Sequence, residues 1–447
     1  MKLTEHPSVR RYFERKTISK TIEPVGPLDS AWVRQVVLDA GADDAGLASI
    51  DNPVLAPYRE EILTIFPETR TCISVICRMN PENVRSPFRQ QYELEYHEMY
   101  AEVNHVARRA AARFAQEGIR ALDCTSSYPM NMETFPNMGM WYIHHKPIAV
   151  AAGRGMMGLH HLVVHERFGP MMALSSILLD REVTEYGKPL DYDPCCKCML
   201  CVTSCPVGAI KADGDINAMA CYVHSYRDRY GGFVDWIENI VSSRTAPEYR
   251  RKHSDAETVL MWQSLSVGTS YKCTNCMAVC PGGDDNIGRY AEDQERYREE
   301  IARKLTDRKE TIYVVKGSDA EAHVMKRFPH KTIKYVHSCT RPTSAATFLQ
   351  NLPLVFEREQ SKGLSAVFHF SFTGAETCQG TVTIRDKKIT VGDGLSGTPD
   401  VRVTADTETW IRILRGEKNF MAALLTRRVR VQGPKNLLKA FVRCFPA

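Results

Sequence analysis

The sequence has no run of about 18 apolar residues, the length that a membrane-spanning helix requires. The pair Arg10-Arg11 resembles the head of a twin-arginine export signal, but such a signal continues into an apolar stretch, and the segment that follows here, TISKTIEPVGPLDS, is polar. We therefore expect no membrane span and a cytoplasmic protein.

Long basic tracts are also missing. The net charge is only +5 over 447 residues, and basic residues are interleaved with acidic ones. We therefore expect no nucleic-acid partner. The composition, 43% hydrophobic and 25% charged, is that of an ordinary globular protein, and the length calls for about two to four domains.

Fifteen cysteines are few for a disulfide scaffold in a chain of this length, and their clustering indicates metal ligation in a reducing compartment. Cys195, Cys198, Cys201 and Cys205-Pro206 spell C-x2-C-x2-C-x3-C-P, the bacterial ferredoxin run, in which the fourth cysteine ligates a second cluster. A structural zinc site would instead use two separate C-x2-C pairs. The run therefore predicts a [4Fe–4S] cluster.

A second run, Cys273, Cys276 and Cys280-Pro281, is one cysteine short, because two clusters need about eight ligands. Cys221, which lies between the runs, is the natural eighth, and a second cluster held by three cysteines is the alternative. The crossing rule then predicts two sets of ligands. A first cluster site takes Cys195, Cys198, Cys201 and Cys280, and a second cluster site takes Cys205, Cys221, Cys273 and Cys276. Cys196 is left as a spare thiol.

The segment PIAVAAGRGMMGLHH contains Gly153-x-Gly155-x-x-Gly158, which we call the glycine loop. A dinucleotide site is disfavoured, because the preceding residues could form a helix and the motif sits late in its domain. Together with the cysteine runs and ADDAGLASI near residue 45, the stretch from Pro147 to Pro170 resembles cobalamin-dependent reductive dehalogenases and epoxyqueuosine reductases. The resemblance spans about residues 30 to 290.

This resemblance implies a nitroreductase-like domain that holds a base-off corrinoid, cobalamin. One cluster would reduce the cobalt, and the other would take electrons from a ferredoxin or flavodoxin-type donor. The corrinoid would be approached by the glycine loop, since glycine lets backbone come close. Leu159-His160 departs from the Arg-Asn or Lys-Asn of these families, and Met171-Met172 replaces the usual basic residue of the dehalogenases. The cofactor-binding residues expected from the resemblance are Gly153, Gly155, Met156, Gly158 and His160.

A reductive reaction also needs a proton donor. Tyr142, His144 and His145 lie just upstream of the glycine loop, and tyrosine and histidine are suited to this role. The alternative is that they end a packed strand. His161 and His165, like His160, are further candidates for facing the corrin or a substrate.

Residues 340–447 resemble sterol carrier protein-2 (SCP-2) domains through an alternating strand, a hairpin with its turn at Asp386-Lys387, and later strands and helices. Such a domain implies either delivery of an apolar molecule or dimerisation, hence a possible homodimer.

The whole chain thus predicts a mixed α+β or α/β architecture. Its expected parts are a nitroreductase-like domain (residues 1–190), a ferredoxin-like domain (191–290), a linker with a solvated helix (291–339) and an SCP-2-like domain (340–447). The expected function is a reductase that cleaves an apolar, possibly halogenated, organic molecule. The alternatives are an epoxyqueuosine-reductase-like enzyme and an electron-transfer or corrinoid-activating protein without its own cobalamin.

Overall fold

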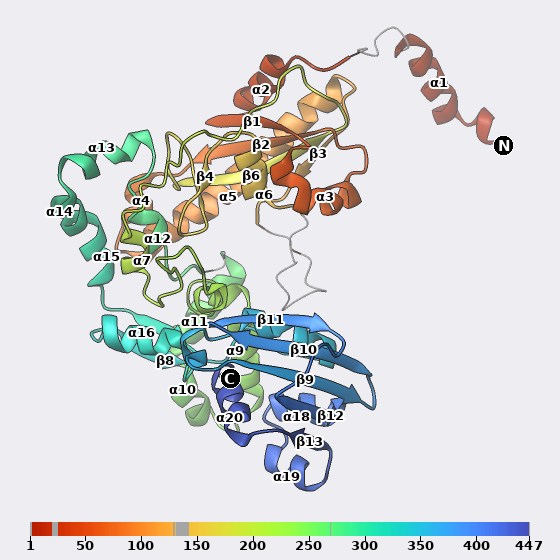
Figure 1. Cartoon of the computed structure of the whole chain (residues 1–447). Helices are drawn as coiled ribbons and strands as arrows, with labels where there is room; N and C mark the ends of the chain where they lie inside the picture. The colour runs from red at the N-terminus through yellow and green to blue at the C-terminus, as the bar shows by residue number, and fades with distance from the viewer. Residues whose placement is uncertain (1, 20–25, 128–129, 131–142, 269, 447) are drawn as a thin grey trace.

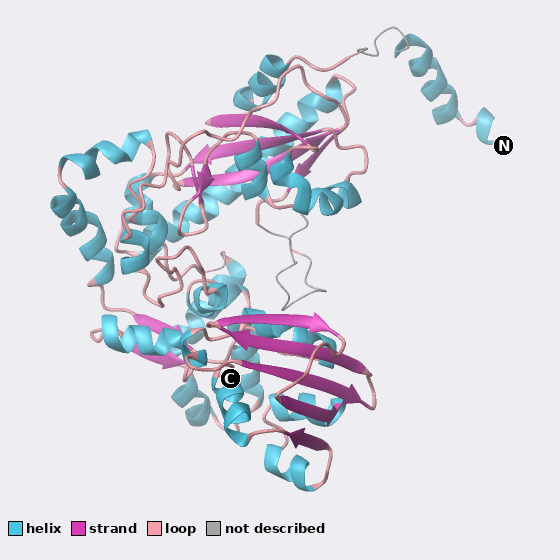
Figure 2. Cartoon of the chain, in the orientation of Figure 1, coloured by secondary structure: helices cyan, strands magenta, loops and turns pink. Residues whose placement is uncertain are grey.

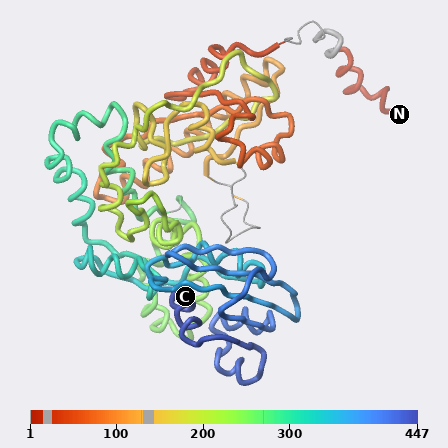
Figure 3. The backbone as a smooth tube through the Cα atoms, viewed as in Figure 1, coloured from red at the N-terminus to blue at the C-terminus, as the bar shows by residue number. Residues whose placement is uncertain are grey.

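The computed structural model describes residues 2–19, 26–127, 130, 143–268 and 270–446 (Figure 1). Figure 3 shows the chain passing from an N-terminal lobe, through a middle region of helices and loops, into a C-terminal domain. Within the described residues, no helix is both long and apolar enough to cross a membrane. Tyr142 lies outside the described residues.

The N-terminal lobe is built on a four-stranded antiparallel sheet in the order β1-β2-β6-β3 (Figure 2). Helices α2 and α5 pack on the sheet through a core that includes Val33, Val37 and Phe114, and α6 contributes Ile148 to a second core with Leu178. Both central strands are buried almost throughout because helices cover the sheet. The elements of this lobe are α1 (Pro7–Ser19), α2 (Ser30–Asp39), β1 (Asp44–Ser49), α3 (Arg59–Ile65), β2 (Thr71–Arg78), α4 (Pro81–Arg85), α5 (Arg89–Gln116), β3 (Ala121–Cys124), α6 (His145–Ala151), β4 (Met156–Met157), β5 (Val163–Val164) and β6 (Met172–Leu179).

The middle region carries the cysteine runs on short helices: α7 (Leu200–Ser204), α8 (Ala218–His224) and α12 (Asn275–Ala278). Between them lie α9 (Gly231–Val241), α10 (Ala246–Lys252) and α11 (Asp255–Ser266), and after them α13 (Asp284–Glu292), α14 (Gln294–Tyr297), the π-helix η4 (Arg298–Arg303) and α15 (Lys304–Thr306). This last stretch was expected to be solvated, but Tyr297 and Leu305 are fully buried in the main core. Its charged residues occupy only the outer face.

Residues 311–335, expected as part of a linker, form a strand–helix–strand unit. Strands β7 (Thr311–Val314) and β8 (Thr332–Tyr335) pair in parallel, and α16 (Asp319–Arg327) connects them. Ile312, Val324 and Phe328 bury this unit against the main core. Each strand has only four residues, which is too short for a strand periodicity to stand out in the sequence.

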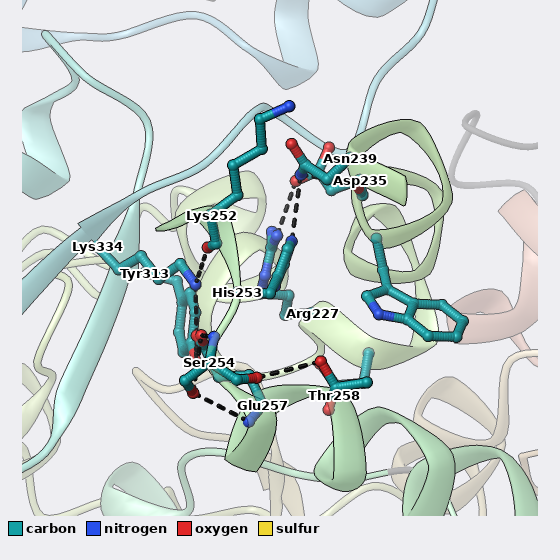
Figure 4. Close-up of polar contacts among 12 residues, drawn as sticks. Arg227, Asp235, Asn239, Lys252, His253, Ser254, Glu257, Thr258, Tyr313 and Lys334 are labelled. Carbon is teal, nitrogen blue, oxygen red and sulfur yellow. Dashed lines mark hydrogen bonds and ion pairs between the residues drawn. The ribbon is translucent and has the colours of Figure 1, made fainter. Parts of the chain in front are cut away.

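A polar network joins this unit to α9, α10 and α11 (Figure 4). Asp235 accepts hydrogen bonds from Arg227 at 2.7 Å and from Arg341 at 2.5 Å, and Lys334 pairs with Glu257 at 2.5 Å. The side chains of Arg227 and Asp235 are each only 6% exposed. The network therefore neutralises buried charge where helices and strands meet.

We expect Asp235→Ala to destabilise the protein by about 3–5 kcal/mol, because it leaves the buried Arg227 guanidinium without its carboxylate. Chemical unfolding followed by circular dichroism measures the difference. Asp255→Ala is the control, since Asp255 pairs with Arg250 at an exposed site and should cost less than about 1 kcal/mol. Equal losses in the two variants would contradict the role of the buried pair.

The C-terminal domain is a five-stranded sheet in the order β11-β10-β9-β12-β13, in which β12 pairs with β9 in parallel. Phe348 and Trp410 from the helices pack on Phe370 and Phe372 of the sheet. The predicted hairpin turn is confirmed: Asp386 and Lys387 have φ values of 50° and 58°, as a tight turn between antiparallel strands requires. The elements are α17 (Ala345–Asn351), β9 (Ala366–Thr373), β10 (Cys378–Arg385), β11 (Lys388–Asp393), β12 (Val401–Asp406), α18 (Thr407–Leu414), α19 (Phe420–Leu425), β13 (Val429–Gln432) and α20 (Lys435–Arg443).

Candidate iron–sulfur centre

The first cysteine run winds tightly around a small cavity. Lys197 and Met199 adopt left-handed backbone conformations, with φ of 50° and 63°, and these turn the chain between successive cysteines. The Cys195 amide donates to Asp193 Oδ1 at 2.9 Å, which secures the start of the run. Helix α7 begins at Leu200, so Cys201 lies in its first turn.

The cavity is small, about 10 Å³, and is lined by cysteines from both runs. Burial raises the pKa of the Cys201 thiol to about 11 and that of Cys280 to about 12. The Cys280 sulfur also accepts a hydrogen bond from the Gly282 amide at 3.4 Å. The cavity-lining cysteines are Cys195, Cys196, Cys198, Cys201 and Cys280, which include all four predicted ligands of the first cluster site.

The thiols of the second predicted site also lie near one another. Burial raises the pKa of Cys273 to about 12, and the nearby Cys205 thiol raises it further. Burial likewise raises the pKa of Cys221 and Cys276, and Cys205 and Cys273 add to both shifts. The two runs are held together by Asn275, whose side-chain amide donates to the Ser204 carbonyl at 3.0 Å. All four thiols are therefore electrostatic neighbours.

The donor set suits iron–sulfur clusters. Within the described ranges, no three His, Cys, Asp or Glu side chains converge on a point that could hold a single metal ion. A cubane is larger than one ion, so its four thiolates line a cavity rather than meet at a point. The four predicted ligands of the first cluster site all line one cavity. An amide N–H group donates to the Cys280 sulfur at 3.4 Å, and another donates to the Cys205 sulfur of the second site at 3.3 Å.

His160 also lines the cavity of the first cluster site. Its side chain is buried, and its Nδ1 accepts a hydrogen bond from the Leu162 amide at 3.1 Å. The Nε2 atom is buried and has no hydrogen-bond partner in the protein. Burial, with help from Lys146 and His161, lowers the pKa of His160 to about 4, so the ring is neutral at physiological pH. The sequence had suggested that His160 faces a corrin, and the structure places it beside the cysteines.

The glycine loop packs on the protein itself. A Cβ at Gly153 would lie 2.2 Å from the Lys188 carbonyl oxygen, and one at Gly155 would lie 2.4 Å from the Val164 carbonyl oxygen. A Cβ at Gly158 would lie 2.8 Å from the His160 ring. The three glycines are therefore required by the loop's own packing. The approach of this loop to a corrin stays a prediction. Met156 lies in β4, opposite Val164 of β5.

His165 belongs to a buried ionic cluster, centred on Asp44, instead of facing a ligand. Its Nε2 donates to Asp44 Oδ2 at 3.0 Å, while its Nδ1 accepts the amides of Arg167 and Phe168. Burial alone would raise the pKa of Asp44, but the hydrogen bond from His165 and the charges of Arg154 and Arg34 outweigh it and hold the pKa far below the ordinary 3.8.

This cluster predicts a pH dependence of stability. Because the pKa of Asp44 is lower in the folded than in the unfolded protein, its contribution is fully present above about pH 4 and is lost as the pH falls further. We expect Asp44→Asn to remove part of the acid sensitivity while lowering stability at pH 7 by about 3 kcal/mol. Unfolding at pH 7 and pH 3 measures both effects, and an equal difference between variant and parent at the two pH values would contradict the assignment.

The two described proton-donor candidates are engaged within the protein. His145 lies between the Ser176 hydroxyl and the Thr125 carbonyl, each at 2.9 Å, and burial lowers its pKa to about 4. His144 contacts Glu61 at 3.1 Å and packs on the Tyr58 ring. Both ring nitrogens of His145 are thus occupied. Of these two candidates, only His144 keeps a ring nitrogen without a partner among the described residues.

Sequence reasoning missed Lys146. Its ammonium donates to the His161 carbonyl at 2.7 Å, which ties α6 to the glycine loop. Although solvent reaches part of this side chain, the surrounding protein lowers its pKa, and the thiols of Cys276 and Cys221 act in the opposite direction. Lys146 therefore places a positive charge near the second cluster site. Its position directly after two histidine candidates was the available signal.

Residues 166–169, which follow the glycine loop, are joined backbone to backbone with residues 282–285, which follow the second cysteine run. A Cβ at Gly169 would lie 2.0 Å from the Gly282 carbonyl oxygen. The amides of Asp284 and Asp285 donate to the carbonyls of Glu166 and Arg167, at 2.8 and 3.1 Å. This junction sets the position of Cys280 relative to the N-terminal lobe.

Comparisons with known proteins confirm the resemblance to epoxyqueuosine reductases and to SCP-2 domains. The chain is 29% identical over 178 residues to the epoxyqueuosine reductase of Lactococcus garvieae, covering 40% of this chain and 41% of the relative. It is 32% identical over 136 residues to that of Aliivibrio fischeri, covering 30% and 29%. The chain thus spans less than half the length of these curated relatives. Residues 352–446 match the SCP-2 sterol transfer family.

The solved structures that align with the chain include an epoxyqueuosine reductase, a reductive dehalogenase and an SCP-2-like protein. Epoxyqueuosine reductase from Streptococcus thermophilus aligns with a TM-score of 0.35 and 16% identity, over 61% of this chain and 74% of that chain. A catabolic reductive dehalogenase aligns with a TM-score of 0.30 and 15% identity, over 39% and 24%. An SCP-2-like protein from Aedes aegypti aligns with a TM-score of 0.20 and 22% identity, over 23% and 95%.

Proposed function

We propose that the protein is an oxidoreductase of the epoxyqueuosine reductase type, which uses two [4Fe–4S] clusters to deliver single electrons to a reductive reaction. The observation that carries this proposal is the cavity lined by Cys195, Cys198, Cys201 and Cys280. Three of these cysteines come from one run and the fourth from another run, some eighty residues on, which is the crossed pattern of two-cluster ferredoxins. The sequence similarity to epoxyqueuosine reductases supports the same function.

The chain's own residues would supply the cluster ligands, the shielding of the clusters from solvent and a nearby positive charge. Cys205, Cys221, Cys273 and Cys276 would hold the second cluster, with the Lys146 charge nearby. The buried residues around the cysteines would limit the access of water and of competing ligands to the clusters. Electrons would come from a ferredoxin or flavodoxin-type protein, because a one-electron cluster needs a one-electron donor.

A corrinoid is the proposed site of the reductive chemistry and would supply a strongly nucleophilic, strongly reducing cobalt centre. Support for it comes from sequence similarity and not from the glycine loop, whose glycines are already used in internal packing. The SCP-2 domain supports an apolar substrate, and a halogenated molecule stays within this proposal. Localisation to the cytoplasm and a homodimer built through the SCP-2 domain are part of the same proposal.

A second candidate is an electron-transfer or corrinoid-activating protein without its own cobalamin. One observation favours this candidate. His160 occupies the position at which the related families have asparagine, and it lines the cavity of the cysteines instead of an open cofactor site.

Metal content distinguishes the two. Protein purified without oxygen from cells fed cobalamin should contain about eight irons and about one cobalt per chain, and corrinoid absorption bands should change on reduction. Eight irons without cobalt, even after reconstitution with cobalamin, would favour the electron-transfer protein. Fewer than about one iron per chain would reject both. Epoxyqueuosine-containing RNA and lipophilic halogenated compounds are then the substrates to compare.

A further inference from the structure

His160 lines the cavity of the first cluster site, and its Nε2 atom is buried and has no partner in the part of the chain that the structure describes. His224 also has an unpartnered buried Nε2, but it does not line this cavity. A buried polar hydrogen without an acceptor is costly, so such a group points to a ligand that accepts a hydrogen bond.

The proton position follows from geometry. The Leu162 amide donates to Nδ1 of His160 at 3.1 Å, so Nδ1 must carry a lone pair rather than a hydrogen. The ring hydrogen therefore lies on Nε2. Gly158 leaves room for the ring in this position, because a Cβ atom there would lie 2.8 Å from the ring carbon Cε1.

We propose that His160 Nε2–H donates a hydrogen bond to a sulfur atom of the cluster held by Cys195, Cys198, Cys201 and Cys280, and that this bond raises the cluster's reduction potential. The inference rests on the proposed function, because it requires that cluster. Hydrogen bonds to cluster sulfurs stabilise the reduced, more negative state and are one of the means by which proteins set these potentials. A neutral imidazole supplies such a bond without adding a charge.

The two cluster sites also differ in the polar side chains around them. The Cys280 sulfur accepts a hydrogen bond from the Gly282 amide, and the Cys205 sulfur accepts one from the Ala209 amide. Each site therefore has a backbone donor of its own. His160 adds a side-chain donor to the first site alone, while Lys146 lies near thiols of the second site. Removal of the His160 donor should therefore move one potential and leave the other unchanged.

The first test is spectroscopic and uses the unaltered protein. The protein is labelled with 15N-histidine, purified without oxygen and reduced, and pulsed electron paramagnetic resonance is recorded on the reduced cluster. A weak 15N coupling is expected, and it should vanish in His160→Leu but persist in His161→Asn. His161 is a suitable control because its φ of 57° is tolerated by asparagine, and its own Nε2 contacts the Gly214 carbonyl.

The second test is a redox titration of both clusters in three variants. His160→Leu should lower the potential of one cluster enough to change its reduced-to-oxidised ratio about tenfold at a given potential, which is about 59 mV for one electron. His160→Gln, which keeps an N–H donor, should recover most of that shift, and His161→Asn should show none.

The outcomes separate this inference from the proposed function. Absence of iron from the parent protein would overturn both. Two clusters with no histidine coupling in the parent, or with potentials unchanged in His160→Leu, would overturn the role of His160 and leave the oxidoreductase intact. If His160→Leu does not assemble its cluster, the coupling in the labelled parent decides alone.

Discussion

Cys221→Ala, purified without oxygen, should contain about four irons per chain where the parent contains about eight. Cys221 lies on α8, outside both runs, and its thiol is a buried neighbour of Cys205 and Cys273. Without it the second cluster keeps three protein ligands and exposes an iron to water or to exogenous thiol, which makes the cluster labile. The rate of electron transfer to an added acceptor should fall by at least about a hundredfold. Loss of a residue that only hydrogen-bonds to a metal ligand already lowers metal affinity or activity by about 10–100-fold.

Cys339→Ala is the matched control for this variant. Cys339 is also buried, and burial raises the pKa of its thiol to about 11. It packs beside Gly231 and in the small core that includes Met219 and Val223 of α8, but it is not a predicted ligand. It should retain about eight irons. Full iron content in Cys221→Ala, measured beside this control, would remove Cys221 from the ligand set and leave a three-cysteine cluster as the arrangement.

Cys280→Ala should remove the other cluster, although Cys280 belongs to the second run. The crossed assignment predicts that Cys221→Ala combined with Cys273→Ala keeps about four irons, because both residues serve one cluster. It also predicts that Cys221→Ala combined with Cys280→Ala keeps almost none, because each cluster then loses a ligand. An assignment by sequence order would predict about four irons in both double variants.

The spare thiol provides the control for Cys280→Ala. Cys196 lines the same cavity and is exposed at its other side. Cys196→Ser should keep both clusters, and electron paramagnetic resonance of the reduced protein should match the parent. Loss of a cluster in Cys196→Ser would show that a neighbouring thiol substitutes for a predicted ligand.

Local patterns in the sequence predicted most of the local structure. The segment LDSAWVRQVVLDAG, residues 28–41, is typical of a helix because Val33, Val36 and Val37 recur on one face, and α2 lies there. Ser30 is a typical cap residue for such a helix, but Asp29 caps it by accepting a hydrogen bond from the Ala31 amide. The hairpin at Asp386 was predictable because turn geometry depends on neighbouring residues alone.

The features that were not predicted depend on contacts between distant residues. The unit at 311–335 is held by packing on the main core, and its short strands carry little periodicity of their own. The ionic partnership of Asp44 and His165 joins residues 121 positions apart. The place of His160 in the cysteine cavity depends on how the N-terminal lobe meets the cysteine runs, which no single-sequence pattern reports.

The backbone junction between Gly169 and Gly282 has a consequence for assembly. One wall of the cavity, with Leu159 and His160, belongs to the N-terminal lobe, and the opposite wall belongs to the cysteine runs. The cavity is complete only when the carbonyls of Glu166 and Arg167 have accepted the amides of Asp284 and Asp285. Cofactor insertion and docking of the two lobes are therefore thermodynamically linked, so the loaded protein should melt in one cooperative step that spans both.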